Sequence, residues 1–196
     1  YKVLLKKCFI LNRHRLQLKK EYLFKSERLG FRNWLPSDAV PCIEMCKDAL
    51  VMEHFPKPLS KEETLALISR LDHHFKKHGY CYFAIDLIGT GAFIGFTGFA
   101  NQTWDSDFTP CVDIGWRLKR SAWGKGYATE SAAACLKIAY SMFGLKEVLA
   151  FTTDTNKASQ GVMTKIGMQY ENTFQHPAII NDPRFKHCVV YKWQYL

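Results

Sequence analysis

The sequence lacks any CxxC pair, any internal repeat and any uninterrupted apolar run of about 18 residues. No segment is therefore long and apolar enough to cross a bilayer, and we expect no membrane partner. The seven cysteines are odd in number and irregularly spaced, which favours reduced, mostly buried thiols over a disulfide framework. Lys6, Lys7, Arg13 and Arg15 break up the apolar pieces near the N-terminus, and no small-residue cleavage site follows. We therefore predict a cytoplasmic protein.

Acidic residues are scarce at the N-terminus. Residues 1–25 hold eight Lys or Arg and one acid, whereas the remainder holds 19 basic and 17 acidic side chains, so most of the net charge of +9 lies in this segment. The nearly neutral body argues against a nucleic-acid partner. The segment is an arm that touches RNA or ribosomes, a solvated flank, or non-native sequence; no methionine precedes Met45, and the last two are favoured. We predict a basic extension over residues 1–22, flexible or non-native, and a single domain over residues 23–196.

Apolar spacing predicts an α/β domain of the α+β type, with a mixed, mostly antiparallel sheet flanked by helices. Strands are expected over 26–34, 81–88, 93–101, 111–118, 147–153, 168–173 and 187–194, and helices over 39–51, from Ser60 to about 78, over 127–143 and over 156–166. Short turns make the three middle strands an antiparallel meander. Ser60 and Glu63 form a capping box. The apolar stripes of the first two helices are expected to include Val40 and Leu65.

The segment from residue 112 to 130 is the most informative one, because a strand there leads into a glycine-containing loop and then a helix. Gly124 and Gly126 allow the backbone to turn sharply and to approach a ligand closely. The unpaired N–H groups at the start of the helix, together with its dipole, form an anion site. Arg120 and Lys125 add positive charge. This arrangement predicts a pyrophosphate ligand.

Three nucleotide-binding patterns were compared with this loop. A Walker-type loop requires GxxxxGK[ST], which fails because Tyr127 follows Gly126. A dinucleotide fingerprint requires GxGxxG, and its third glycine position is Thr129 here. The coenzyme A loop of the GNAT acetyltransferases, [RQ]xxGx[GA], matches at both glycines and departs only at its first position, which is Ser121.

Longer motifs around the loop carry a family resemblance. They are IGWRL at 114–118, WGKGYATE at 123–130, NKAS at 156–159 and KIGM at 165–168, with ERL at 27–29, Trp34, His176-Pro177, His187 and Tyr191 at the two ends. Together they resemble the RimJ/RimL branch of the GNAT superfamily, which includes ribosomal-protein N-terminal acetyltransferases. The resemblance spans about residues 24–194, so only the basic segment lies outside it.

The resemblance implies a GNAT-like acyl-CoA N-acyltransferase fold, with acetyl-CoA as co-substrate and no metal. The acceptor amine would attack the thioester directly, and a backbone N–H near residues 116–118 would stabilise the carbonyl oxygen. The implied cofactor-binding residues are Trp116, Arg117, Leu118, Trp123, Gly124, Lys125, Gly126, Tyr127, Ala128 and Asn156.

The resemblance says less about which residues transfer protons during the reaction. Asp113 lies where many relatives carry an acidic residue and would be the base, or else a hydrogen-bonded strand carboxylate. The late-helix tyrosine that protonates the thiolate in many relatives is replaced by Met163. Ser159, one turn earlier, would be the acid, or else it caps or packs the helix. An α-amine with a pKa of about 8 needs little help to lose its proton, whereas a lysine acceptor near about 10.4 needs several kcal/mol.

Two other groups of residues give weaker evidence for a functional site. His74 and His78 have helical metal-ligand spacing, but no carboxylate motif accompanies them, which favours a solvated helix end. Trp34, Phe55 and Trp104 line an acceptor cleft or belong to the core. We predict an N-acetyltransferase, monomeric or homodimeric, whose acceptor is a protein N-terminus or a small-molecule amine. The alternative is a non-catalytic RNA- or ribosome-binding module that uses the basic segment.

Overall fold

Segments rich in β-branched and aromatic residues pair into one sheet, in the order β1-β2-β3-β4-β5-β6-β8-β7. The computed structural model describes residues 21–177, 182–183 and 187–195, and the sheet has eight strands within these ranges. The strands are β1 (Phe24–Lys25), β2 (Leu29–Arg32), β3 (Tyr82–Leu87), β4 (Ala92–Gln102), β5 (Cys111–Leu118), β6 (Glu147–Thr153), β7 (Gln169–Phe174) and β8 (Cys188–Gln194). All neighbours are antiparallel except β5 and β6, which are parallel. The predicted fold class is confirmed.

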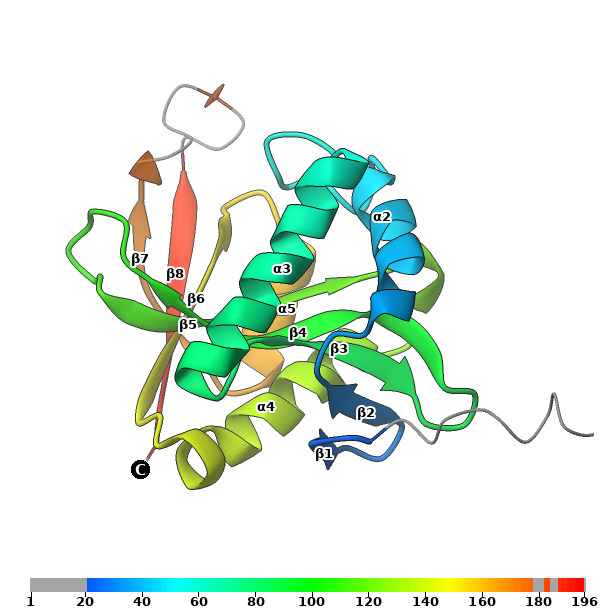
Figure 1. Cartoon of the computed structure of the whole chain (residues 1–196). Helices are drawn as coiled ribbons and strands as arrows, with labels where there is room; N and C mark the ends of the chain where they lie inside the picture. Colours follow the sequence, from blue (N-terminus) through cyan, green and yellow to red (C-terminus); the bar gives the residue numbers. More distant parts are fainter. Residues whose placement is uncertain (1–20, 178–181, 184–186, 196) are drawn as a thin grey trace, which may run out of the picture.

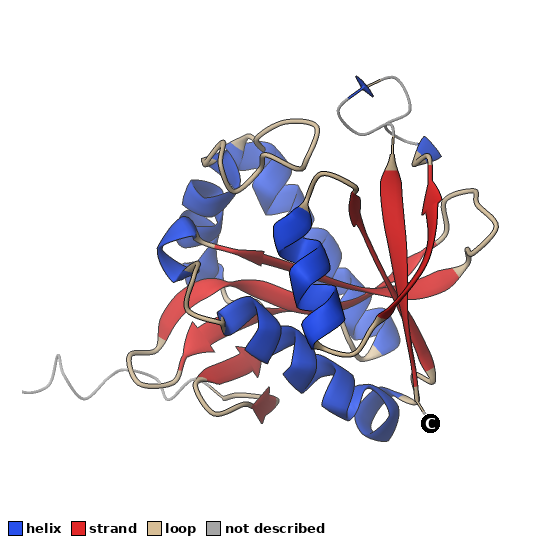
Figure 2. Ribbon diagram, turned by 180° about the vertical axis from the view of Figure 1, so that it is seen from behind, coloured by secondary structure: helices blue, strands red, loops and turns tan. Residues whose placement is uncertain are grey.

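Helices cover both faces of the sheet. They are α2 (Ala39–Lys47), α3 (Lys61–His78), α4 (Tyr127–Phe143) and α5 (Lys157–Lys165), with 3-10 turns at Pro36–Asp38 and Arg120–Ala122. Figure 1 shows α2 and α3 packed together in front of the sheet, and Figure 2, seen from behind, shows α4 and α5 on the opposite face. The core lies between these layers, and Phe31, Phe83 and Phe99 are among its largest fully buried side chains.

The later elements follow the sequence pattern closely. Helix α4 and strand β6 begin and end at the predicted residues. The predicted capping box is present before α3, because Ser60 Oγ accepts the Glu63 N–H at 3.1 Å and the Glu63 carboxylate accepts the Ser60 N–H at 2.8 Å. Local capping chemistry therefore sets these boundaries.

The first predicted strand is wrong as a single element. The chain forms β1 and β2 instead, joined by a turn that begins at Ser26. The turn is stabilised by a residue far along the chain, because Glu130 accepts hydrogen bonds from the Ser26 hydroxyl and from the Arg28 N–H. A contact over such a distance leaves no local pattern in the sequence.

The apolar stripe of α2 also differs from expectation, whereas that of α3 differs only at Leu65, since Leu67, Ile68, Leu71 and Phe75 pack in or against the core. Val40 is 65% exposed and Leu65 is 40% exposed, so neither belongs to a buried face. Helix α2 instead buries Cys42, Met45 and Cys46, which follow the helical repeat. It also ends earlier than predicted, at Lys47. The Arg117 guanidinium on β5 donates to Cys46 Sγ at 3.3 Å, so this face of α2 lies against the sheet.

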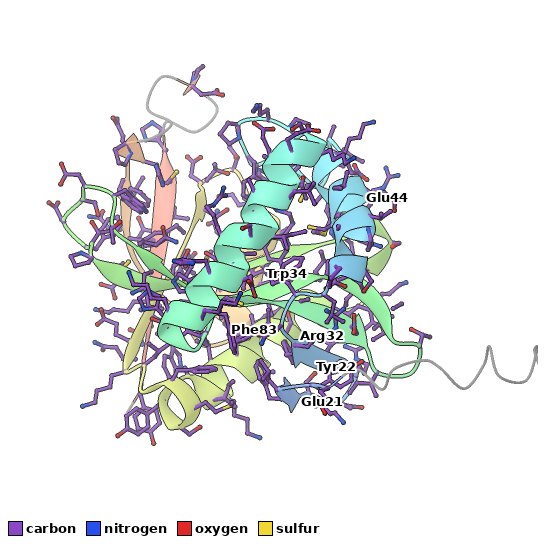
Figure 3. The ribbon with its side chains drawn as sticks, in the orientation of Figure 1. Glu21, Tyr22, Arg32, Trp34, Glu44 and Phe83 are labelled. Carbon is purple, nitrogen blue, oxygen red and sulfur yellow. The ribbon has the colours of Figure 1, made fainter. Side chains whose placement is uncertain are left out.

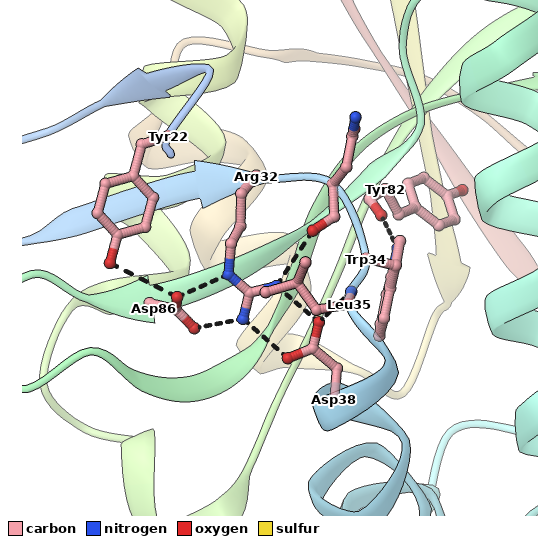
Figure 4. Close-up of polar contacts among 8 residues, drawn as sticks. Tyr22, Arg32, Trp34, Leu35, Asp38, Tyr82 and Asp86 are labelled. Carbon is pink, nitrogen blue, oxygen red and sulfur yellow. Dashed lines mark hydrogen bonds and ion pairs between the residues drawn. The ribbon is translucent and has the colours of Figure 1, made fainter. Parts of the chain in front are cut away.

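A buried ion network holds the segment that leads from β2 into α2 (Figures 3 and 4). The Arg32 guanidinium donates to both oxygens of Asp38 and both oxygens of Asp86, at 2.6 to 2.8 Å. Burial on its own would lower the pKa of Arg32, but the hydrogen bonds and charges of the two carboxylates hold that pKa above its ordinary value. Next along the chain, Trp34 Nε1 donates to the Tyr82 carbonyl oxygen at 2.8 Å. The network therefore fixes the β2–α2 connection against β3.

No helix in the described part of the chain combines the length and the apolar character needed to cross a bilayer. Cys42, Cys46, Cys81, Cys111 and Cys135 are free thiols, and all of them except Cys111 are buried. This state fits the reduced, mostly buried thiols that their irregular spacing predicts.

Candidate active site

The site originates where β5 and β6 separate. Strand β5 pairs with β4 along its whole length, but it pairs with the parallel strand β6 only at Asp113 and Leu149. Beyond that point the two strands diverge toward their carboxyl ends. Backbone groups alternate in direction along a strand, and the Lys119 N–H donates to the β4 carbonyl of Ile94 at 2.9 Å. The N–H groups of Trp116 and Leu118 therefore point toward the gap.

A cavity of about 780 Å³ occupies this divergence, a volume typical of small-molecule sites. Side chains and backbone from β5, β6, α4, α5 and the α2–α3 connection line it. All but one of the site residues predicted from the sequence are among its lining residues: Asp113, Trp116, Arg117, Leu118, Trp123, Gly124, Gly126, Tyr127, Ala128, Asn156 and Ser159. The exception is Lys125.

The loop between β5 and α4 presents backbone N–H groups at one end of the cavity. Gly124 and Gly126 have φ angles of +71° and +79°, a region that favours glycine. Gly126 is the N-cap of α4 and contributes no capping side chain, and the first i to i−4 bond runs from the Glu130 N–H to the Gly126 carbonyl. The N–H groups of the first helical turn are thus left without intrahelical acceptors. With the helix dipole they form an anion site.

Three polar side chains near this loop make contacts within the protein. The Lys125 Nζ donates to the Ser121 carbonyl oxygen at 2.9 Å, which explains why Lys125 does not line the cavity. The Trp123 indole N–H donates to the Leu118 carbonyl at 2.9 Å and ties the loop to the end of β5. The Arg117 Cζ lies 4.1 Å from the centroid of the Phe55 ring and 5.2 Å from the centroid of the Phe96 ring. The Arg117 side chain therefore supports the α2–α3 connection.

A carboxyl–phenol pair lies on the floor of the cavity. Asp113 on β5 is 8% exposed, and the Tyr82 hydroxyl on β3 lies 2.7 and 2.8 Å from its two carboxyl oxygens. Burial raises the pKa of Asp113 to about 6, although hydrogen bonds from Tyr82 and Gln102 oppose that shift. Burial and the neighbouring carboxylate also raise the pKa of Tyr82 well above its ordinary value. With a pKa of about 6, Asp113 is mostly ionised at neutral pH and can accept a proton from an amine.

Gly115 makes room for this pair. A Cβ at position 115 would lie 3.0 Å from both Cζ and the hydroxyl oxygen of Tyr82. We expect Gly115→Ala to push the Tyr82 ring away from Asp113, to cost about 1–3 kcal/mol of stability, and to reduce turnover at neutral pH. Urea denaturation and steady-state kinetics measure the two effects. Gly161→Ala on α5 is the control, because nothing lies within 4 Å of a Cβ there and alanine favours helix. Equal activity of the two variants would contradict the role given to Gly115.

The start of α5 borders the cavity opposite β5. The side-chain Oδ1 of Asn156 accepts the Ser159 N–H at 3.1 Å, and its Nδ2 donates to the Thr152 hydroxyl at 2.9 Å, so Asn156 caps this helix. The Ser159 hydroxyl has no hydrogen-bond acceptor or donor among the described residues, and it lines the cavity. Met163 is buried in the core, so no acid stands at that position.

The α2–α3 connection forms a further wall. His54 and Phe55 line the cavity, and His54 Nδ1 lies 3.3 Å from the Thr153 hydroxyl on β6. Trp34 is buried in the core instead. Trp104 belongs to an aromatic cluster beside the cavity, in which its ring packs against Phe151 and other rings.

His74 has a structural role that its spacing did not reveal. Its Nδ1 lies 2.8 Å from the Tyr80 carbonyl, and its Nε2 accepts the Asn101 N–H at 3.1 Å. Nδ1 thus contacts the connection from α3 to β3 and Nε2 contacts β4, so this residue is more than part of a solvated helix end. Within the described ranges, no three His, Cys, Asp or Glu side chains are grouped as metal ligands.

Sequence reasoning missed Tyr82, Arg28 and Glu130. The signal available for Tyr82 was Gly115, because a glycine inside a strand marks a close approach of another group. Arg28 and Glu130 meet across 102 positions of sequence, and no spacing pattern connects them.

Comparison with known proteins gives a consistent result. The family described as "Acetyltransferase (GNAT) domain" matches residues 28–169. The uncharacterized protein YkkB of Bacillus subtilis (strain 168) is 30% identical over 128 residues, 65% of this chain and 73% of that protein. The FsC-acetyl coenzyme A-N(2)-transacetylase of Aspergillus fumigatus is 27% identical over 142 residues, 67% of this chain and 57% of that protein.

Solved structures show the same fold. An acetyltransferase of the GNAT family from Bacillus anthracis superposes with a TM-score of 0.74 at 26% identity, over 87% of this chain and 96% of that one. RimL, a ribosomal L7/L12 alpha-N-protein acetyltransferase in complex with coenzyme A, gives a TM-score of 0.73 at 18% identity, over 89% and 98% of the two chains. The second likeness concerns the fold alone.

Proposed function

The chain belongs to the GNAT acetyltransferase family through residues 28–169 and is an acyltransferase, and from this premise we propose that it moves an acetyl group from acetyl-CoA to a primary amine. One observation carries the proposal. The divergence of β5 and β6 joins an anion-binding loop to a carboxyl group that titrates near neutral pH, within a single cavity. The loop suits the phosphates of an acyl-CoA, and the carboxyl group suits an amine acceptor.

The residues present fit coenzyme A. The N–H groups of Trp116 and Leu118 suit the thioester end and an amide of the pantetheine arm, respectively, and the loop from Trp123 to Ala128 suits the pyrophosphate, with open space around Gly124. Lys125 contributes its backbone, because its side chain donates to the Ser121 carbonyl, whereas the backbone of Arg117 pairs with β4 and its side chain borders the site beside Phe55. Bound there, acetyl-CoA supplies a thioester whose carbonyl carbon an amine attacks.

Each remaining step uses a group of this chain. Asp113 accepts a proton from the acceptor ammonium, and Tyr82 holds its carboxylate in place. The Trp116 N–H, the nearer of the two to Asp113 along β5, stabilises negative charge on the carbonyl oxygen. The Ser159 hydroxyl gives its proton to the departing thiolate and takes up the proton that the attacking nitrogen loses, and Asn156 caps the helix that carries Ser159.

The finer assignments are part of the proposal. The sequence motifs of this chain favour the RimJ/RimL-like branch, with a protein N-terminus or a small-molecule amine as acceptor. We further propose one domain over residues 23–196, active as a monomer or homodimer in the cytoplasm. The alternative of a non-catalytic RNA- or ribosome-binding module depends on a basic segment of which residues 1–20 lie outside the described part of the chain.

Acetyl-CoA is expected to stabilise the protein and to be consumed. At a concentration 100 times Kd, ligand binding adds about 2.7 kcal/mol, which raises the Tm of a domain of this size by about 5–10 °C. Thermal melting measures the shift, and release of free thiol with N-terminal peptides or small amines measures turnover. Absence of both effects would refute the proposed function.

A further inference from the structure

We infer that Arg28, on the turn between β1 and β2, binds a phosphate group of the coenzyme. This inference rests on the proposed function, because it concerns the ligand of the β5–α4 loop. The family pattern for that loop begins with Arg or Gln, and this chain has Ser121 there. The loop therefore lacks a cation at its own first position.

Arg28 lies directly over the N-terminus of α4. Its Cζ is 4.5 Å from the centroid of the Tyr127 ring, in the first turn of the helix. A Cβ built on Gly126 would lie 3.5 Å from the Arg28 Nη2, so a terminal nitrogen of the guanidinium reaches the N-cap. The positive charge thus stands beside the N–H groups that form the anion site.

Glu130 holds Arg28 in this position. Its Oε2 accepts from Arg28 Nε at 2.6 Å, and its Oε1 accepts from the Arg28 backbone N–H at 2.8 Å and from the Ser26 hydroxyl at 2.7 Å. The contact uses only the Nε edge of the guanidinium. Among the described residues, no acceptor lies within hydrogen-bonding distance of its two terminal nitrogens, and the Arg28 side chain is 44% exposed.

Two cations of the loop segment itself, Lys125 and Arg120, are engaged elsewhere. Lys125 donates to the Ser121 carbonyl, and Arg120 Nε lies 3.5 Å from an oxygen of Asp48. Arg28, whose terminal nitrogen reaches the N-cap of α4, therefore supplies the charge missing at position 121, whereas Lys165, which lines the cavity, lies at the C-terminal end of α5. A guanidinium fork matches two oxygens of one phosphate, which a lysine cannot do. Coenzyme A offers this chemistry in its diphosphate and in its ribose 3′-phosphate.

Calorimetry with coenzyme A and 3′-dephospho-coenzyme A tests the inference. Four proteins are compared: wild type, Arg28→Gln, Glu130→Gln, and Arg70→Gln, which removes an exposed arginine from α3 on the opposite face. We expect Arg28→Gln to raise the Kd for coenzyme A about tenfold or more, because a charged hydrogen bond is lost. The Kd should also depend less on salt concentration. Glu130→Gln breaks the same ion pair but keeps the cation, so it should weaken binding far less. Arg70→Gln should bind as wild type does.

The second ligand identifies the phosphate. If Arg28→Gln weakens the binding of both ligands equally, Arg28 binds the diphosphate. If only the binding of coenzyme A weakens, Arg28 binds the 3′-phosphate. Unchanged binding in Arg28→Gln would overturn the inference. So would equal losses in Arg28→Gln and Glu130→Gln, because the ion pair would then matter only for folding. Failure of the wild type to bind either ligand would instead remove the proposed function, and the inference with it.

Discussion

Replacing Arg32 by methionine is expected to lower the free energy of unfolding by about 3–5 kcal/mol, a large share of the stability of a typical domain. The change leaves the carboxylates of Asp38 and Asp86 in the interior, 1% and 0% exposed, without the guanidinium that donates to all four of their oxygens. Removal of one partner from a buried network costs far more than the net value of the contact. Urea denaturation at pH 7 measures the loss.

Lys76→Met is the matched control for this prediction. It breaks the ion pair between Lys76 and Asp72 on α3, whose side chains are 71% and 42% exposed, and should cost no more than about 0.5 kcal/mol. A triple variant that adds Asp38→Asn and Asp86→Asn to Arg32→Met should recover much of the stability. Similar small losses in Arg32→Met and Lys76→Met would show that the network does not stabilise the fold.

Local chemistry made much of this fold predictable. Glycines at positions 126 and 144 limit α4, and the Ser60–Glu63 capping box starts α3, so these boundaries can be read from a few neighbouring residues. The loop at Gly124 and Gly126 was predictable for the same reason, since its anion-binding backbone depends on consecutive residues. Asp113, predicted from the family resemblance, lines the cavity, and its role as a base stays a prediction.

The side-chain contacts that could not be predicted from the sequence depend on strand register and on long-range folding. Tyr82 and Asp113 are 31 positions apart, and they meet only because β3 and β5 both pair with β4 in one particular register. Arg28 meets Glu130 across 102 positions, and its turn replaces the single strand predicted there. Alternating apolar residues indicate that a strand exists, but they do not state which residues of two strands lie side by side.

Asp113→Asn is expected to lower kcat/KM by a factor of about 100 or more at neutral pH, the usual contribution of a general base. Asparagine keeps the size of the side chain and can still accept a hydrogen bond from the Tyr82 hydroxyl, so the loss reports proton transfer. Steady-state kinetics with acetyl-CoA and an accepted amine measure it. Asp72→Asn removes a carboxylate from the surface of α3 and should leave the rate within about twofold of wild type. A wild-type rate in Asp113→Asn would show that this carboxyl group is not the base.

The same substitution should stabilise the protein above pH 6. The pKa of Asp113 is raised from 3.8 to about 6, so the folded state holds its proton more tightly than the unfolded state does. The penalty for ionising Asp113 is absent below about pH 4, grows between these two pKa values, and reaches about 3 kcal/mol at neutral pH. Asp113→Asn removes that penalty, and urea denaturation at pH 4 and pH 7.5 separates the two regimes. A variant less stable than wild type at pH 7.5 would contradict the raised pKa.

Tyr82→Phe tests whether the phenol acts through Asp113. The Tyr82 hydrogen bond lowers the pKa of Asp113 against the effect of burial, so its loss should raise that pKa further. We therefore expect the acidic limb of the kcat/KM profile to move to higher pH in Tyr82→Phe. A purely structural role for Tyr82 would reduce activity at every pH without moving the limb. The direction of the shift thus distinguishes a phenol that tunes the base from one that only fills the floor of the cavity.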